Sequence, residues 1–213
     1  MQADFWHERW QEGRIGFHQE KPNALLVAHL DALQLRTGDR VFVPLCGKTL
    51  DIGWLHAQGF RVAGAELSEI AVRQLFDEIG TVPEVIQTGE LKLYRSDGLD
   101  IYAGDIFDLD SGTLGAVDAV FDRAALVALP PEMRVRYAAH LATITEHARQ
   151  LLITFDYDQS IMDGPPFSVP DGEVEQHYAQ AYSLTRLASM DVEGGLKGMC
   201  PALANLWLLK AGH

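Results

Sequence analysis

Residues 41–52, VFVPLCGKTLDI, decide the fold. An apolar run typical of a buried parallel strand leads into a turn at Gly47, and a helical segment follows directly. About twenty residues later, a second short apolar strand at 61–65 ends at Glu66. This order of strand, glycine turn, helix, strand and acidic residue is typical of an adenosine-cofactor site in a doubly wound α/β sheet. We therefore expect Glu66 to lie where the hydroxyls of a ribose bind.

Composition limits the class of protein and its partners. The 213 residues are 47% apolar and 22% charged, which suits one globular domain spanning 1–213. The net charge is −13 and no Lys/Arg cluster stands out, so we expect neither a nucleic-acid partner nor an anionic membrane. Nothing at the N-terminus resembles a signal peptide, and no apolar run approaches the roughly 18 residues of a membrane helix. We expect a cytoplasmic protein that is a monomer by default.

Metal-binding and cysteine signals are weak. The two cysteines, Cys46 and Cys200, lie far apart, and the eight histidines are scattered without metal-ligand spacing, so we expect no metal. Cys46 lies in the turn after the first strand. A nucleophilic role for this thiol is conceivable, but no base is identifiable beside it, and we interpret it as a small packed residue.

The remaining chain alternates strands with helices. We predict a doubly wound, mostly parallel seven-stranded sheet that ends in an antiparallel C-terminal hairpin, and a loop over 81–90. Ligands of such sheets bind at the carboxyl ends of the strands. We expect these ends at the segments 44–47, 66, 104–107, 122–123 and 156–157.

The glycine turn does not suit a nucleotide phosphate. A phosphate-binding loop needs a glycine five residues before its Gly-Lys pair, and Phe42 occupies that position. The dinucleotide fingerprint needs three spaced glycines, and here Gly47 stands alone. A ligand with an adenosine end and no phosphate is compatible, and S-adenosylmethionine is such a ligand. The alternative is a tight turn with only a packing role.

Two further strand ends suit an adenosine group. The Glu66 carboxylate can accept from both ribose hydroxyls; alternatively it caps the next helix, although Ser68 already suits that cap. Asp105 is followed by Ile106 and Phe107, where an adenine ring could pack against Ile106. An ordinary strand end with a buried isoleucine explains that segment equally well.

A cation and two indoles complete the candidate site. Arg123 can bind an anionic or electron-rich substrate group, or else pair internally with Asp122. Trp6 and Trp10 are either core aromatics of an N-terminal helix or a cover for the cofactor, because an indole face attracts a cation such as a sulfonium.

Six segments of the chain resemble one enzyme family. They are FWHERWQEGRIGFH, VFVPLCGKTLDIGWL, VAGAELSEIAV, GDIFDL, FDRAALVALPPEMR and DGPPFSVP, and together they resemble the bacterial thiopurine S-methyltransferases in order over nearly the whole chain. Common class I methyltransferases carry an acid before a Gly-x-Gly turn. This chain has Pro44 and a single Gly47 instead, as that family does.

The resemblance implies roles for particular residues. It implies cofactor contacts at Trp10, Leu45, Glu66, Ile106, Phe107 and Arg123. It implies that Phe17 and Arg123 border the substrate, that residues 1–21 form an N-terminal cover, and that residues 158–173 form a mobile lid over the acceptor. Bacterial members also resemble enzymes linked to selenium and tellurium methylation, and hence to metalloid resistance.

We therefore predict transfer of a methyl group from S-adenosylmethionine to the sulfur of a thiopurine or another aromatic thiol, or to selenium or tellurium. The sulfonium already activates the methyl group, so the protein mainly supplies position and a dry site, and no dedicated base is evident. Arg123 could stabilise the anionic acceptor, with Asp122 orienting it. The rival classes are a nicotinamide-dependent oxidoreductase and a non-catalytic adenosine-binding module.

Overall fold

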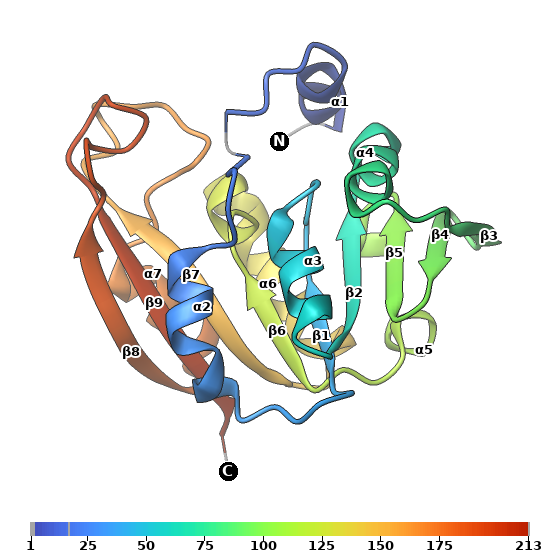
Figure 1. The fold of residues 1–213 in the computed structure, drawn as a ribbon. Helices are drawn as coiled ribbons and strands as arrows, with labels where there is room; N and C mark the ends of the chain where they lie inside the picture. Colours follow the sequence, from blue (N-terminus) through green and yellow to red (C-terminus); the bar gives the residue numbers. More distant parts are fainter. Residues whose placement is uncertain (1–2, 17, 213) are drawn as a thin grey trace.

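The computed structural model describes residues 3–16 and 18–212, and within them a nine-stranded sheet forms the centre of the molecule (Figure 1). The strands are β1 (Arg40–Val43), β2 (Arg61–Glu66), β3 (Glu84–Thr88), β4 (Leu91–Ser96), β5 (Leu99–Ala103), β6 (Ala119–Asp122), β7 (Arg149–Asp156), β8 (Tyr182–Asp191) and β9 (Leu203–Ala211). The helices are α1 (Ala3–Gln11), α2 (Ala24–His29), α3 (Leu50–Ala57), α4 (Glu69–Ile79), α5 (Ser111–Leu114), α6 (Pro131–Ile144) and α7 (Asp171–Tyr178). Short 3₁₀ turns add η1 (Leu30–Leu33), η2 (Ile106–Asp108) and η3 (Leu126–Ala128).

The sheet is parallel in its centre and antiparallel at both sides. Its strand order is β3-β4-β5-β2-β1-β6-β7-β9-β8. The five central strands from β5 to β7 pair in parallel, whereas β3–β4–β5 and β7–β9–β8 pair antiparallel. The predicted doubly wound sheet and its C-terminal hairpin are confirmed.

The predicted number of seven strands is wrong. β3 lies inside the segment 81–90 that we expected to be a loop. It pairs only with β4 and forms one edge of the sheet, so neither face carries the apolar run that marks a buried strand. Val85, for example, is 53% exposed. Edge strands of this kind give a weak sequence signal because burial does not constrain them.

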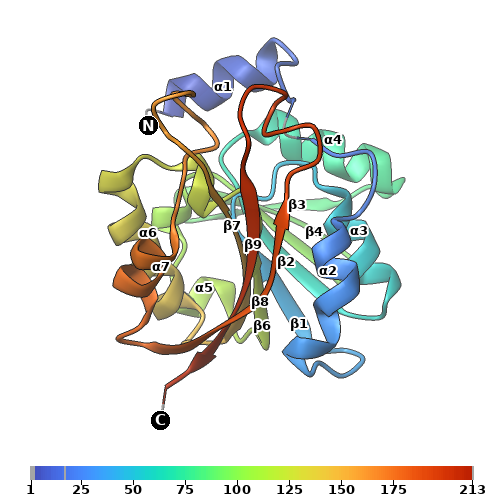
Figure 2. The ribbon, with the colours of Figure 1, turned by 90° about the vertical axis from the view of Figure 1, so that its left-hand side faces the viewer.

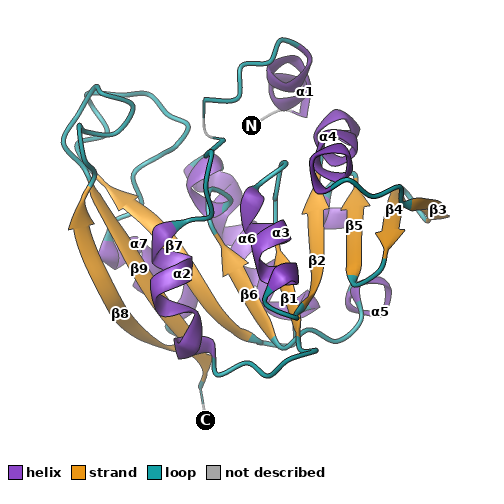
Figure 3. Cartoon of the chain, viewed as in Figure 1, coloured by secondary structure: helices purple, strands orange, loops and turns teal. Residues whose placement is uncertain are grey.

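Helices cover both faces of the sheet (Figure 2, Figure 3). On one face, α2, α3 and α4 bury residues such as Leu26, Ile52 and Leu75 in one apolar core. On the other face, α6 and α7 bury residues such as Tyr137 and Val174 in a second core. Each central strand is covered on both sides, which explains its nearly continuous apolar sequence.

Local signals fix the ends of the helices. The Ser68 Oγ accepts from Ala71 N and caps α4, and Gly80, with φ 79°, ends that helix in a left-handed conformation. Pro131 opens α6, since a proline loses no hydrogen bond in a first turn. α7 already begins at Asp171, so the loop predicted over 158–173 ends one turn earlier than expected.

Three segments gather beyond the carboxyl ends of the parallel strands (Figure 1). α1 lies above β1 and β2, while the loops 157–170 and 192–202 lie beyond the ends of β7 and β8. These segments are far apart in the sequence and share one end of the sheet. Among the described helices, none is both long enough and apolar enough to cross a membrane.

Candidate functional site

Four of the predicted site residues follow neighbouring strands. Leu45 follows β1, Glu66 ends β2, Ile106 lies just after β5, and Arg123 follows β6. Their strands are adjacent in the order β5-β2-β1-β6, and all run parallel. Parallel strands end at the same edge of a sheet, so the fold brings these four positions together where doubly wound sheets bind their ligands.

Glu66 is a buried carboxylate held by two backbone amides. Gly47 N donates to its Oε2 at 2.8 Å, and Ser68 N donates to its Oε1 at 2.7 Å. Burial raises the pKa of Glu66 to about 7, although the amides of Ser68, Gly47 and Leu67 favour the charged form. Each oxygen accepts one hydrogen bond from the chain and keeps a further lone pair. Glu66 therefore ties the glycine turn to β2 and can still accept from a ligand.

The turn after β1 is tightly constrained. Leu45 has φ 45° and Gly47 has φ 56°, so two residues occupy the left-handed region that non-glycine residues avoid. Cys46 N donates to Ala65 O at 2.9 Å, which seats the turn on β2. A Cβ at Gly64 would lie 2.9 Å from the Cys46 sulfur, so only glycine leaves room for this thiol. Burial, and then the Glu66 charge, raise the pKa of Cys46 well above its usual range, which leaves it a packed neutral thiol.

Ile106 and Phe107 lie in a 3₁₀ turn instead of the strand end that we expected. Asp105 caps this turn by accepting from Phe107 N at 3.0 Å. Ile106 is buried, and its carbonyl oxygen lies 2.8 Å from His140 Nε2. The Phe107 ring packs on α6, 3.7 Å from the guanidinium carbon of Arg136. The Phe107 ring thus already has a partner on the side of α6.

Arg123 is held near a different carboxylate from the one that we expected. Burial lowers the pKa of its guanidinium, and the charge of Asp51 opposes that effect. Asp51 is fully buried at the start of α3 and accepts from Asn23 N at 2.7 Å. Asp122, which we expected to orient Arg123, instead accepts from Tyr137 Oη at 2.7 Å and from Leu126 N at 3.1 Å. The neighbour in sequence faces away into the core because strand side chains alternate.

The two predicted indoles, Trp6 and Trp10, lie on the N-terminal helix α1. Trp10 is buried on α1, and α1 contacts α4. Trp6 is half-buried, and its ring meets that of Phe5 edge to face, with the centroids 5.3 Å apart. Phe17, predicted to border the substrate, lies outside the described residues.

The loop 157–170 is tied down along its length. Gln159 accepts from Ser168 N at 2.7 Å and donates to Met162 O at 2.5 Å, closing the loop on itself. Phe167 N donates to Val127 O at 2.7 Å, which anchors the loop beside the turn that carries Arg123. The loop also shares a small apolar cluster with the segment 192–202 through Tyr157, Met162, Leu196, Cys200 and Ala202.

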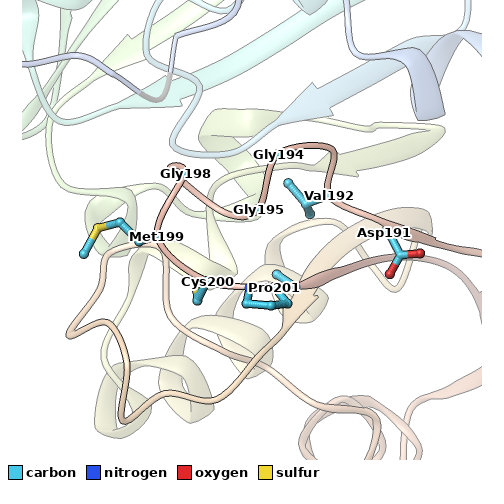
Figure 4. A pocket seen from close by; sticks show the side chains of 9 residues that line it. Asp191, Val192, Gly194, Gly195, Gly198, Met199, Cys200 and Pro201 are labelled. Carbon is cyan, nitrogen blue, oxygen red and sulfur yellow. The ribbon is translucent and has the colours of Figure 1, made fainter.

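The segment 192–202 closes against the same loop. Lys197 Nζ donates to Pro165 O at 2.5 Å. Burial, and then the charge of Arg9, lower the pKa of Lys197, so the segment also lies within reach of α1. This segment encloses a cavity of about 320 Å³, and Figure 4 shows the side chains that line it. It is lined by Asp191, Val192, Gly194, Gly195, Gly198, Met199, Cys200, Pro201 and Ala202.

A second cavity, of about 580 Å³, lies on α4 and the edge strands β3 and β4. Glu69 borders it, and hydrogen bonds from Lys92, Tyr94 and Arg73 lower the pKa of this carboxyl to about 2. None of the predicted site residues that the structure describes lines either cavity. Within the described chain, no group of three or more His, Cys, Asp or Glu side chains is arranged to hold a metal ion.

Two residues of this region escaped the sequence prediction. Asp51 acts on Arg123, and Tyr137 holds Asp122, yet each lies far from its partner in the sequence. Thr49 caps α3 through Asp51 N, so a helix-capping signal marked the place of Asp51 without indicating its relation to Arg123. Tyr137 gave no separate signal, because a tyrosine on an apolar helix face is ordinarily core.

Sequence comparison identifies the family. The chain matches the family model for thiopurine S-methyltransferase over residues 1–198. It is 56% identical to the thiopurine S-methyltransferase of Xanthobacter autotrophicus, over 99% of each chain. It is 49% identical to that of Gluconobacter oxydans, over 96% of this chain and 93% of the relative.

Solved structures share the fold at low identity. A 1,6-didemethyltoxoflavin-N1-methyltransferase from Burkholderia thailandensis has a TM-score of 0.66 at 18% identity, over 99% of this chain and 87% of its own. Magnesium protoporphyrin IX methyltransferase from Synechocystis has a TM-score of 0.66 at 14% identity, over 98% of both chains. These likenesses establish the methyltransferase fold, and the sequence matches establish more. The chain belongs to the thiopurine S-methyltransferase family and is an enzyme that uses S-adenosylmethionine as its methyl donor.

Proposed function

We propose that the enzyme transfers the methyl group to the sulfur of thiopurines or other aromatic and heterocyclic thiols. The observation that carries this proposal is a half-buried cation, Arg123, at the same end of the parallel strands as Glu66 and two strands further along the sheet. A guanidinium in a water-poor site stabilises a thiolate more strongly than it would in water. Relatives that are named for thiopurine methylation support the same choice of acceptor.

The residues at β1 and β2 fit the cofactor. The Glu66 carboxylate keeps one lone pair on each oxygen, which matches the two hydroxyls of a ribose. The turn at Leu45 and Gly47 brings backbone close to this carboxylate without the glycine-rich loop that a phosphate needs. We assign the adenine to the buried Ile106, with Phe107 contributing backbone since its ring packs against Arg136.

When bound, S-adenosylmethionine supplies a methyl group that its sulfonium activates for in-line displacement. The chain then has to orient the acceptor sulfur and keep water away. In our proposal Arg123 pairs with the thiolate, and the charge of Asp51 offsets part of the effect of burial on the guanidinium. Aromatic thiols ionise near neutral pH, so this scheme needs no general base.

Two cover segments, one N-terminal and one that follows β7, complete the site in this proposal. Residues 1–21 carry Trp10, whose indole can face the cationic sulfonium. The loop within 158–173 covers the acceptor side, and its anchor at Val127 O lies four residues from Arg123. We treat 1–213 as one domain, since covers and sheet serve a single site.

Selenium and tellurium compounds are further candidate acceptors, because their anions are soft nucleophiles like thiolates. We also propose a reducing, cytoplasmic setting: Cys46 and Cys200 are both free and buried. We propose that the enzyme acts as a monomer on a small molecule. The rival oxidoreductase is disfavoured by the single glycine of the turn, and a non-catalytic module by the half-buried Arg123 beside the cofactor residues.

Incubation with methyl-labelled S-adenosylmethionine and a panel of thiols, selenols and metalloid oxyanions tests the proposal. We expect label on the sulfur of aromatic thiols. Arg123→Ala should lower kcat/KM by about 10- to 100-fold, since a charge-assisted contact is worth about 1.5–3 kcal/mol. The control is Arg36→Ala, an exposed arginine near the amino end of β1, which should leave kcat/KM within about twofold. Absence of transfer to every acceptor would refute the proposal.

A further inference from the structure

The turn that carries Arg123 is stabilised by the carboxylate of Asp122. Asp122 ends β6 with its side chain fully buried, and Oδ1 of Asp122 accepts from Leu126 N at 3.1 Å. This bond closes residues 122–126 into a tight turn. Ala124, in its middle, has φ 60°, a conformation that a residue with a Cβ adopts only when its surroundings impose it.

One hydroxyl secures that carboxylate. Tyr137 Oη donates to Asp122 Oδ2 at 2.7 Å, and Tyr137 is fully buried on α6, on the face of the sheet that α6 and α7 cover. A buried carboxylate that loses a donor is left under-bonded, which costs about 1–3 kcal/mol and favours rearrangement. The Tyr137 hydroxyl therefore stabilises the Asp122 carboxylate in the position from which it accepts from Leu126 N.

The same turn receives the cover loop. Three residues after Ala124, Val127 O accepts from Phe167 N at 2.7 Å. Arg134, also on α6, donates to Ser168 O at 3.2 Å and ion-pairs with Glu173 at 2.6 Å. Arg123 and the loop 157–170 thus share one short support that α6 steadies.

We propose that Tyr137 is a positioning residue for Arg123: its hydroxyl fixes the Asp122 carboxylate, and the carboxylate fixes the turn that aims the guanidinium and anchors the cover loop. The inference rests on the proposed function, in which Arg123 contacts the acceptor. Tyr137 acts only through Asp122 and touches no reacting atom in this scheme.

A matched pair of tyrosines provides the test. Tyr178 on α7 is equally buried in the same core, and its hydroxyl makes no hydrogen bond of ordinary geometry among the described residues. Tyr137→Phe should lower kcat for an aromatic thiol by about tenfold, because small misplacements of a reacting group are costly. Its calorimetric cofactor affinity should stay within about threefold of wild type, since Glu66 is untouched. Tyr178→Phe should leave kcat within about twofold.

The pH profile separates positioning from general loosening. Asp122 faces Tyr137 from α6 and Tyr178 from α7, and burial raises the pKa of both hydroxyls so that they stay neutral. Asp122 itself, with a pKa of about 6, is the group that changes charge. At saturating cofactor and with a thiol that stays ionised, kcat should fall on the acid side near pH 6. Tyr137→Phe should move that limb to higher pH, and Asp122→Asn should remove it.

Hydrogen exchange gives a readout that needs no turnover. Tyr137→Phe should speed exchange at residues 122–128 and at Phe167, while Tyr178→Phe should not. Midpoints of urea unfolding, measured for both variants, serve as the control that each variant is folded. Equal kcat and equal exchange in the two variants would overturn the inference. If wild type methylates no thiol, the proposed function fails, and unchanged exchange at 122–128 in Tyr137→Phe would still refute the support described here.

Discussion

Glu66 combines two properties that oppose each other. It is buried, which favours the neutral acid, yet it must accept hydrogen bonds, which favours the anion. The amides of Gly47 and Ser68 offset part of the cost of burial, and the pKa of Glu66 remains raised to about 7. A carboxyl with such a pKa responds to ligand binding close to neutral pH.

We predict that cofactor affinity falls as the pH falls below about 7. Ribose hydroxyls donate to the ionised Glu66 carboxylate, so binding favours the charged form and lowers its pKa, and a proton is released. Calorimetric titrations in buffers of different ionisation enthalpy measure both effects. Glu66→Gln keeps the shape but does not titrate, so its affinity should be weaker and flat between about pH 6 and pH 8. An equally steep pH dependence in Glu66→Gln would exclude this carboxyl as the cause.

Single residues were predictable where a strand end marks them. Glu66 and Arg123 follow apolar strands, and the edge of a parallel sheet collects such positions. Asp51 and Tyr137 were not predictable, because each acts on a residue of another element. Asp51 in addition lies more than 60 residues from Arg123 in the sequence. The orientation of the Phe107 ring was not predictable either, because its partner, Arg136, lies on a different element, α6.

At the scale of elements, β2 and the turn after β1 pack closely because Gly64 of β2 has no side chain. A Cβ at Gly64 would lie 2.9 Å from both Cys46 Sγ and Ile101 Cδ1, and both of these side chains are buried. We predict that Gly64→Ala lowers the free energy of unfolding by about 1–3 kcal/mol, as overpacking does. It should also weaken cofactor binding, because the turn has to move away from Glu66.

Urea unfolding measures the stability of this variant, with Gly53→Ala as the matched control. Gly53 lies in α3, where an added Cβ would meet Ile79 at an ordinary 4.0 Å. Alanine is the better helix former by about 1 kcal/mol, so Gly53→Ala should be neutral or stabilising. Wild-type stability in Gly64→Ala would show that the turn tolerates displacement.

The loop 157–170 depends on one amide side chain. Gln159 bridges the two arms of the loop through Ser168 N and Met162 O. We predict that Gln159→Ala speeds proteolysis within 158–170 and raises the KM of the acceptor, because the arms separate. Limited proteolysis and steady-state kinetics measure the two effects. Ser160→Ala is the control, since the Ser160 Oγ hydrogen bond within the described residues goes to the exposed Asp158. Equal cleavage rates in the two variants would contradict a bracing role for Gln159.

Elements were predictable in proportion to their burial. The parallel strands and β9 carry apolar runs because the molecule covers them on both faces, whereas the edge strand β8 is mostly exposed. β3 was missed because its exposed edge imposes no such pattern. The starts of α4 and α6 were predictable from Ser68 and Pro131, because capping by serine and the fixed φ of proline act within one helical turn.

At the scale of the whole molecule, two cores support a single ligand edge. Each core fills one face of the sheet, and the segments α1, 157–170 and 192–202 all lie beyond the carboxyl ends of the parallel strands (Figure 1). A ligand of this site binds the native state and not the unfolded chain, because only folding brings the site residues together. Its binding energy therefore adds to the stability of the native state.

We predict that S-adenosylhomocysteine at about 100 times its Kd stabilises the protein by about 2.7 kcal/mol, which raises Tm by roughly 5–10 °C. Differential scanning calorimetry measures the shift. Glu66→Ala should show a smaller shift at the same concentration, since it lacks the ribose acceptor. A nicotinamide dinucleotide should give no shift, and a shift as large as that of S-adenosylhomocysteine would favour the rival oxidoreductase.

Methyl transfer in a single turnover is the most direct test of the central claim. Enzyme, methyl-labelled S-adenosylmethionine and one equivalent of an aromatic thiol are mixed, quenched over time and analysed by mass spectrometry. We predict that the label appears on the acceptor sulfur as a thioether, and that Arg123→Ala slows its appearance about 10- to 100-fold at saturating cofactor. Label on an oxygen or nitrogen of the acceptor, or no transfer at all, would contradict an S-methyltransferase built around Glu66 and Arg123.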